Sequence, residues 1–240
     1  MENKVSKGKT QRTELNSVTE HIEDSYALVI GFEVDEPEKN YQPIREVLTG
    51  KIEKYHYVVD EPGHTFIYLS KNMKITHFFS LGPLASQDGS EGGDLKRIYG
   101  RGTPDYWIPG ETKLFRFALT KEEYEMLGKN IMIEREQVLS SEKNYKVIGN
   151  YTCAATARDI IVSVWPTMPK GESDVVLMGD RQGLELTGGV RVVNPYALYD
   201  DLVKWGGVYR VIPPRRKMWE KIMMGNIKKD PYFDMGDKNE

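Results

Sequence analysis

The sequence predicts an α+β fold in which an antiparallel sheet packs against a helix that begins near Cys153. Two observations carry this prediction. Two runs rich in aromatic and β-branched residues, 64–69 and 74–81, are separated only by the short segment 70–73, which indicates a β-hairpin. The segment that begins at Cys153 combines alanines with an apolar stripe at helical spacing, which indicates a helix.

The composition is typical of a soluble globular protein. Of the 240 residues, 39% are hydrophobic and 29% are charged, and the length suits one large domain or one domain with appendages. The formal net charge of -3 excludes a general attraction to nucleic acid. No apolar run reaches the roughly 18–20 residues that span a bilayer. A single cysteine excludes an intramolecular disulfide. We therefore expect folding in a reducing cytoplasm, no nucleic-acid partner and no stable membrane insertion.

Charge and glycine content predict the domain organisation. Residues 1–24 carry many charges and few apolar groups, so we expect a flexible N-terminal arm without a secretory signal. Residues 25–240 are expected to form a single domain. Within it we predict a loop insertion at 82–110, which contains seven glycines and three prolines, and a C-terminal extension that covers about 170–240.

Three elements are expected before the hairpin. Residues 26–34 are almost all apolar and predict the first buried strand. A short helix is expected between Tyr41 and Gly50, because Pro43 lies near its start and Gly50 follows its end. Residues 55–59 are expected to be extended again.

The turn of the hairpin decides where its histidines lie. If residues 71–72 form a two-residue turn, His64 lies opposite Phe79 and His77 falls on the same face of the sheet as His64. A three-residue turn shifts the pairing and brings Ser80 opposite His64 instead.

Further signals follow the loop insertion. Residues 113–119 alternate like a half-buried strand. The segment 120–123 (Thr-Lys-Glu-Glu) is a capping box and starts a helix that is expected to reach about Leu139. Residues 144–148 are expected to be extended, and Pro166 ends the cysteine helix.

The C-terminal quarter is less regular. Short strands are expected at 175–178 and 190–193. Asn194 and Pro195 mark a helix start, with Asn as the cap and Pro at the first position, and the helix is expected to reach Trp205. The last expected elements are an edge strand at 208–212 and a short helix at 218–227.

Cys153 lies where its predicted helix begins. Thr152 or Asn150 can cap the first amides of that helix. A thiol in the first turn of a helix faces the positive end of the helix dipole, which favours the nucleophilic thiolate. The alternative interpretation is a buried small hydrophobic residue, because free cysteine is among the most buried residue types.

A cysteine nucleophile needs a base, and the base usually needs a polar group that holds its tautomer. His64 opens a strand directly after Gly63, a position from which an imidazole can project over a neighbouring helix terminus. We predict His64 as the base and His77 as the orienting residue, with Ser80 as the rival for this third role. The alternative for each histidine is an ordinary hydrogen-bonded residue of the sheet.

These segments resemble the active-site motifs of circularly permuted NlpC-type papain-like enzymes. The stretch from Gly63 to His77 is similar to the hairpin that carries their catalytic histidine, and Asn150-Tyr151-Thr152-Cys153-Ala154 is similar to their cysteine-bearing helix start. Here the histidine precedes the cysteine, which is the permuted order, also found in lecithin:retinol acyltransferase-like proteins. In many permuted members Asn directly precedes Cys, whereas two residues intervene here. The chain also resembles the TseH-type hydrolase effectors of bacterial type VI secretion.

The resemblance implies a papain-like domain that hydrolyses an amide through a covalent thioester. Cys153 would be the nucleophile, and His64 would be the general base and acid. The backbone amide of Cys153 would be one oxyanion donor, with Tyr151 as a second contact or, in the alternative, packed under the hairpin. Tyr106 and Trp107 in the loop insertion would be substrate contacts or, in the alternative, an aromatic anchor of that loop.

The resemblance also implies a biological setting. The substrate would be a peptide of the peptidoglycan stem or cross-link, and the protein would be an antibacterial toxin. It would be made in the bacterial cytoplasm and delivered to the target-cell periplasm, with the secretion machinery and a cognate immunity protein as partners. We expect no cofactor, and the four histidines show no zinc-site spacing.

Two other functional classes remain open at this point. A lipid-directed acyltransferase or thioesterase would use the same Cys–His pair. A non-catalytic binding module would have the same fold without a functional pair.

Overall fold

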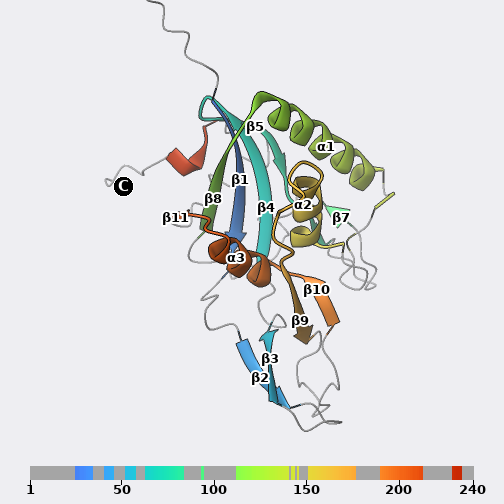
Figure 1. The fold of residues 1–240 in the computed structure, drawn as a ribbon. Coiled ribbons are helices and arrows are strands. Elements are labelled where there is room, and N and C mark those ends of the chain that lie inside the picture. Colours follow the sequence, from blue (N-terminus) through green and yellow to red (C-terminus); the bar gives the residue numbers. More distant parts are fainter. Residues whose placement is uncertain are drawn as a thin grey trace, which may run out of the picture.

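The protein has an α+β fold built on a five-stranded antiparallel sheet (Figure 1). The computed structural model describes residues 25–34, 41–45, 52–57, 63–83, 93–94, 112–140, 142–143, 145, 151–176, 190–212 and 229–233. In chain order, the strands of the main sheet are β1 (Tyr26–Glu33), β4 (His64–Lys71), β5 (Lys74–Phe79), β8 (Thr112–Leu119) and β11 (Tyr209–Ile212). Their spatial order is β11-β8-β1-β4-β5, so β11 is an edge strand, as predicted.

A second sheet of four strands lies beyond one end of the main sheet (Figure 1). Its strands are β2 (Tyr41–Arg45), β3 (Ile52–Tyr57), β9 (Glu172–Val176) and β10 (Val190–Val193), in the order β10-β9-β3-β2. The helix predicted from Tyr41 is wrong over β2, because this segment pairs with β3 in an antiparallel ladder. Pro43 is compatible with β2 because β2 is an edge strand. Residues 46–50 lie outside the described ranges.

The helices are α1 (Lys121–Leu139), α2 (Cys153–Val162) and α3 (Pro195–Lys204), with a short 3₁₀ helix, η3 (Pro231–Phe233). The predicted starts of the three α-helices are confirmed by their caps. Thr120 and Glu123 form a complete capping box on α1. Thr152 caps α2, and Asn194 caps α3 with Pro195 in the first turn. Each cap accepts a hydrogen bond from an amide three residues on, so these boundaries depend on local sequence alone.

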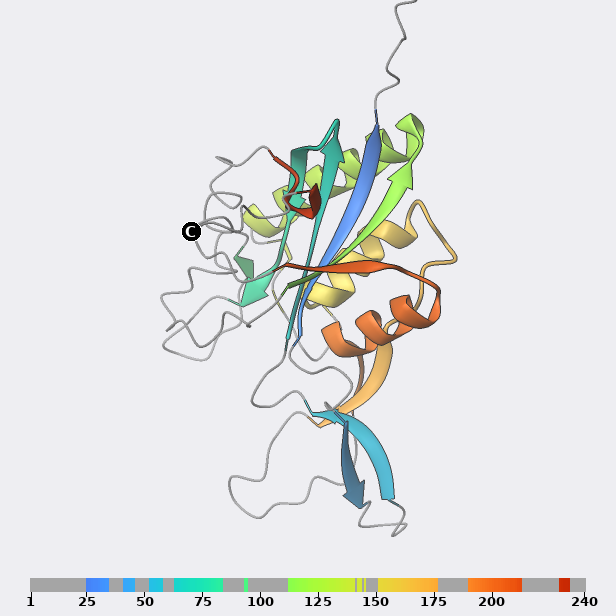
Figure 2. The same cartoon turned by 90° about the vertical axis from the view of Figure 1, so that its left-hand side faces the viewer.

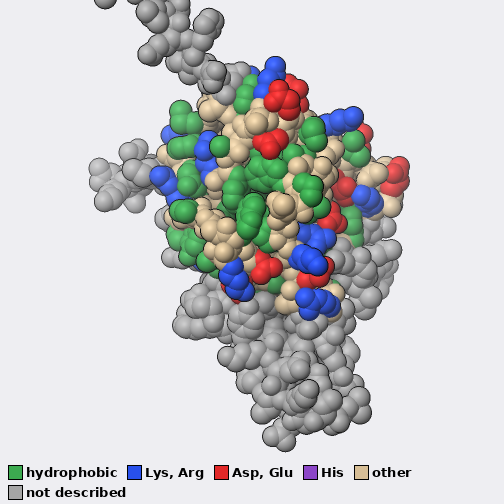
Figure 3. All heavy atoms as spheres, in the orientation of Figure 1, with side chains coloured by type: hydrophobic (Ala, Val, Ile, Leu, Met, Phe, Trp, Pro, Cys, Tyr) green, Lys and Arg blue, Asp and Glu red, His purple; other side chains and the backbone are tan. Residues whose placement is uncertain are grey.

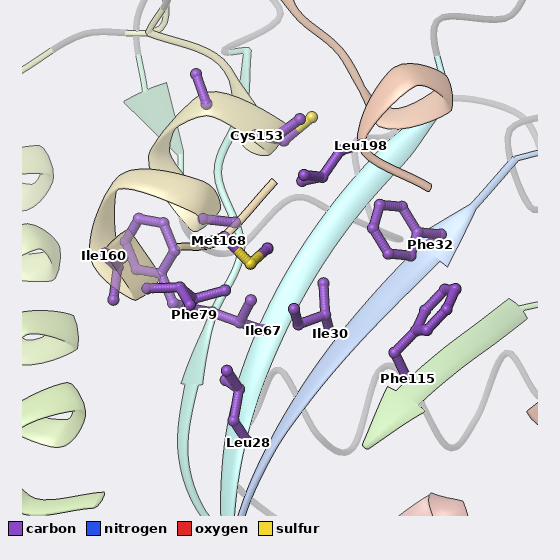
Figure 4. Packing of buried hydrophobic residues seen from close by; sticks show 14 of the residues in the cluster. Leu28, Ile30, Phe32, Ile67, Phe79, Phe115, Cys153, Ile160, Met168 and Leu198 are labelled. Atoms are coloured by element: carbon purple, nitrogen blue, oxygen red, sulfur yellow. The ribbon is translucent and has the colours of Figure 1, made fainter. Parts of the chain in front are cut away.

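One face of the main sheet is covered by helices. Its apolar side chains come from alternate positions of the strands and pack against residues of α1, α2 and α3. Figure 4 shows part of this cluster, including Leu28, Ile30, Phe32, Ile67, Phe79, Phe115, Ile160 and Leu198. Ile131 of α1 belongs to the same cluster. Figure 2 shows α2 and α3 on this side of the sheet and η3 on the other.

The opposite face of the sheet carries the C-terminal segment. The Tyr68 hydroxyl donates to Asp230 Oδ1 over 2.6 Å, and both residues are fully buried. The Asp230 amide donates to the Met73 carbonyl, and the Arg116 guanidinium lies 4.8 Å from the Phe233 ring centroid. The segment 229–233 is therefore held against β4, the turn of the hairpin and β8.

The hairpin of β4 and β5 confirms the predicted strands but not their register. Asn72 and Met73 occupy the turn with positive φ, so Lys71 lies opposite Lys74. An irregularity between Leu69 and Ser70 shifts the pairing by one further residue. Phe79 consequently lies opposite Ile67 and not opposite His64. The register thus differs from the predicted one by three positions, which is an odd number. Because strand side chains alternate, this shift moves the β5 residues to the other face.

The surface seen from the helix side is mixed in character. Hydrophobic side chains gather in the middle of the view, with Lys, Arg, Asp and Glu around them (Figure 3). Within the described ranges, no helix has both the length and the apolar content that crossing a membrane requires.

The C-terminal quarter supplies α3 and β11 to the domain. Four predicted segments lie wholly or mostly outside the described residues: the arm 1–24, the loop insertion 82–110, the strand 144–148 and the helix 218–227. The described parts of the loop insertion, β6 (Gly82–Pro83) and β7 (Gly93–Asp94), pair with each other.

Candidate active site

Cys153 is the first residue of α2, as predicted. The Thr152 hydroxyl accepts from the Ala155 amide and donates to the Val193 carbonyl, both at 3.3 Å. The first contact caps α2, and the second joins the start of α2 to the segment that leads into α3. The Cys153 side chain is 4% exposed and belongs to the apolar cluster. The position at the start of α2 is the one predicted for a nucleophile, and the burial is the one predicted for a small hydrophobic core residue. Both interpretations of Cys153 therefore agree with the structure.

His64 is the first residue of β4 and is buried, with 8% of its surface exposed. Its Nε2 lies 2.6 Å from Ser80 Oγ, and Ser80 itself is buried. The hydroxyl therefore holds the imidazole by one ring nitrogen, as the third residue of a catalytic set does. Ser80, the rival candidate, therefore makes the contact with His64 that we predicted first for His77.

His77 does not share a face with His64, so that prediction is wrong. It lies opposite Leu69 in the ladder, and its ring packs edge-on against Tyr124 of α1, 5.8 Å between centroids. Its Nδ1 is 3.1 Å from Thr76 Oγ1. A Cβ added to Gly128 would lie 3.1 Å from the His77 ring, so the helix and the imidazole touch. Burial lowers the pKa of His77 below its ordinary value.

Tyr151 precedes the cap of α2 and is joined to α1. Its hydroxyl donates to Glu134, which also accepts from Lys143 Nζ at 2.7 Å and 3.0 Å. Burial, and then the hydrogen bond to the Glu134 carboxylate, raise the pKa of the Tyr151 hydroxyl. An oxyanion contact from this hydroxyl would require it to leave Glu134. The structure favours a role for Tyr151 in holding the start of α2 in place.

The starts of α2 and β4 lie at the same end of the main sheet. A Cβ added to Gly63, next to His64, would lie 3.2 Å from Pro195 Cβ at the start of α3. Thr152, next to Cys153, bonds the Val193 carbonyl two residues before Pro195. Figure 4 shows Cys153 and Leu198 of α3 at the end of the sheet where Phe32 lies.

The alternation of β4 determines how the two groups can approach each other. His64 lies on the same face of β4 as Phe66, with their ring centroids 6.5 Å apart, whereas Ile67 and Leu69 face the helices. The imidazole therefore lies on the face of the sheet opposite the helix-covered face, to whose apolar cluster Cys153 belongs, and not on the helix-covered face that the sequence predicted.

Glu33 was missed in the sequence. It is the last residue of β1, lies directly opposite His64 in the antiparallel ladder, and is only 4% exposed. The signal that points to it is a single carboxylate inside an otherwise apolar strand, because buried Glu is rare unless it is paired.

Tyr106 and Trp107 lie outside the described residues. In the part of the chain that the structure describes, no three His, Cys, Asp or Glu side chains lie close enough together to hold a metal ion. Comparisons of the chain with protein-family models, curated proteins and solved structures found no match.

Proposed function

We propose that the protein is a cysteine-dependent hydrolase of the amidase or peptidase class, with a papain-like arrangement in permuted order. The observation that carries the proposal is the 2.6 Å contact between His64 Nε2 and Ser80 Oγ, at the end of the sheet where α2 begins with Cys153. A nucleophile, a base and a residue that orients the base are the three parts that covalent acyl transfer needs.

In the proposed mechanism, His64 faces the thiol with Nδ1 while Ser80 holds Nε2. The Cys153 thiolate attacks the carbonyl carbon of an amide, and a sulfur–carbon bond forms. The backbone amide of Cys153, at the first position of α2, donates to the developing oxyanion. The carbon–nitrogen bond breaks as the His64 imidazolium gives its proton to the leaving amine. Water then attacks the thioester, His64 takes a proton from it, and the thiolate leaves.

The substrate class comes from the motif resemblance. The hairpin and the cysteine segment are similar to those of enzymes that cleave peptide bonds in peptidoglycan. We propose a peptidoglycan peptide as substrate and the role of a secreted antibacterial toxin with an immunity protein.

Digestion of purified peptidoglycan tests the proposal. Wild type should release muropeptide fragments with new amine termini, detected by chromatography and mass spectrometry. Cys153→Ala and His64→Ala should release none, while His77→Gln should stay active, because His77 contacts α1 and not His64. Equal product from Cys153→Ala would exclude Cys153 as the nucleophile. Hydrolysis of lipid esters but not of peptidoglycan would replace the substrate class and keep the chemistry.

A further inference from the structure

A buried carboxylate lies beside the proposed base. Glu33 and His64 are directly opposed in the ladder between β1 and β4, and both are buried. Directly opposed side chains of an antiparallel pair have Cβ atoms about 4.5–5.5 Å apart and project from the same face. The Glu33 and His64 side chains are therefore neighbours on one face of the sheet.

The surroundings of His64 fix the side of the sheet on which this pair lies. The Phe66 ring covers Gly31, since a Cβ added there would lie 2.1 Å from Phe66 Cζ. The His64 ring stacks on the same Phe66 ring with an interplanar angle of 22°. Gly31 and Glu33 alternate with Phe32, which faces the helices. The imidazole is thus held between Phe66 and Ser80, on the side of the sheet where Glu33 projects.

Other ionisable groups face this end of the sheet. Cys153 comes from α2, and Tyr196 from α3 packs beside Gly63. Lys113 of β8 lies opposite Phe32, on the helix side, and donates to the Val34 carbonyl at 3.0 Å. Among these described neighbours, Glu33 is the acidic group on the same side of the sheet as the His64 ring.

We propose that Glu33 is a positioning residue that stabilises the imidazolium form of His64 and thereby the thiolate of Cys153. A carboxylate and an imidazolium attract each other strongly when both are shielded from water. A buried carboxylate also costs free energy unless a positive charge lies near it, so each group favours the charged form of the other. This inference rests on the proposed function, since it assumes that His64 serves Cys153.

The test uses the reactivity of the only cysteine in the chain. Alkylation of Cys153 by iodoacetamide is followed by mass spectrometry as a function of pH, which requires no knowledge of the substrate. In wild type, the reaction should stay fast below neutral pH, because the ion pair keeps the thiolate. In Glu33→Gln, the rise of the alkylation rate with pH should begin at a higher pH than in wild type. At mildly acidic pH the rate should be about tenfold lower for each pH unit of this displacement. Glu125→Gln, an exposed site on α1, controls for the loss of one negative charge.

The outcomes separate this inference from the function on which it rests. If wild type alkylates like an ordinary thiol and His64→Ala leaves its profile unchanged, the Cys–His pair itself is excluded. If His64→Ala slows alkylation at acidic pH but Glu33→Gln superimposes on wild type, the role of Glu33 is excluded and the pair stands.

A second measurement covers the case in which Glu33→Gln does not fold. In Cys153→Ala, the imidazole of His64 is titrated by NMR beside that of His77, whose pKa is lowered by burial. Removal of the thiolate leaves Glu33 as the acidic neighbour, so His64 should titrate at higher pH than His77. Titration of His64 at or below the pH of His77 would overturn the inference.

Discussion

Ser80 Oγ lies 2.6 Å from His64 Nε2 and joins the residue that follows β5 to the first residue of β4. Both groups are buried, so the hydrogen bond is shielded from water and restricts rotation of the imidazole.

Ser80→Ala should lower turnover more than substrate binding, because the loss affects the orientation of the base. Leaving one buried partner of a hydrogen bond unpaired costs about 1–3 kcal/mol, which corresponds to roughly a 5- to 150-fold loss in rate. Initial rates of peptidoglycan digestion measure this loss. His77→Gln is the matched control, since it removes the other candidate for the orienting role. A fully active Ser80→Ala would assign the contact to folding alone.

Thr152→Ala should destabilise the protein and also disturb Cys153. The hydroxyl caps α2 and bonds Val193, so we expect a loss of about 1–2 kcal/mol in the free energy of unfolding and slower alkylation of Cys153. Thr152→Ser keeps the cap and should behave like wild type. Thr120→Ala, which removes the cap of α1, should reduce stability but leave the rate of alkylation unchanged. An equal effect of both substitutions on alkylation would contradict this assignment.

Gly31→Ala tests the packing beneath His64. The added methyl group would lie 2.1 Å from Phe66 Cζ, so the ring on which His64 stacks has to move. Overpacking of this kind should cost about 1–3 kcal/mol in the free energy of unfolding, measured by urea denaturation. The double variant Gly31→Ala/Phe66→Leu should recover part of the loss. Wild-type stability of Gly31→Ala would show that Phe66 does not cover this glycine.

The pH dependence of stability should contain a contribution from His77. Burial lowers its pKa in the folded protein, while the unfolded chain has the ordinary value of 6.5. Between these two values the unfolded state binds more protons, so the free energy of unfolding falls as the pH decreases below about 6.5. His77→Gln removes this contribution. Urea unfolding at about pH 7.5 and about pH 5 should therefore show a smaller loss for the variant than for wild type. Identical losses would count against the lowered pKa.

The caps of the helices were predictable because their interactions span only three residues. The boundaries at Thr120, Thr152 and Asn194 all agree with the structure. The same holds for the strands of the hairpin, whose apolar character is visible in the sequence itself.

The register of the hairpin was not predictable in the same way. It depends on the positive φ of Asn72 and Met73 and on the irregularity after Leu69, and neither has a strong local signature. Because of this difference in register, Ser80 and not His77 contacts His64 in the candidate site. The β2 segment shows a related effect. Pro43 and Gly50 are placed as at the start and end of a helix, but the pairing of β2 with β3 determines the conformation of Tyr41–Arg45.

Glu33 illustrates what only a three-dimensional arrangement reveals. In the sequence it is a single charge near the end of an apolar strand, 31 positions before His64 (64 minus 33). The ladder between β1 and β4 makes these two residues direct neighbours. No spacing rule within one segment indicates such a pair.

The most direct test of the central claim is a double-mutant cycle on Cys153 and His64. The value of kcat/KM on a peptidoglycan peptide is measured for wild type, Cys153→Ser, His64→Gln and the double variant. Groups that act as one catalytic unit lose their contribution once, so the double variant should be no slower than the slower single variant. If the two losses multiply, Cys153 and His64 act independently, and the proposed thiolate–imidazolium pair is wrong.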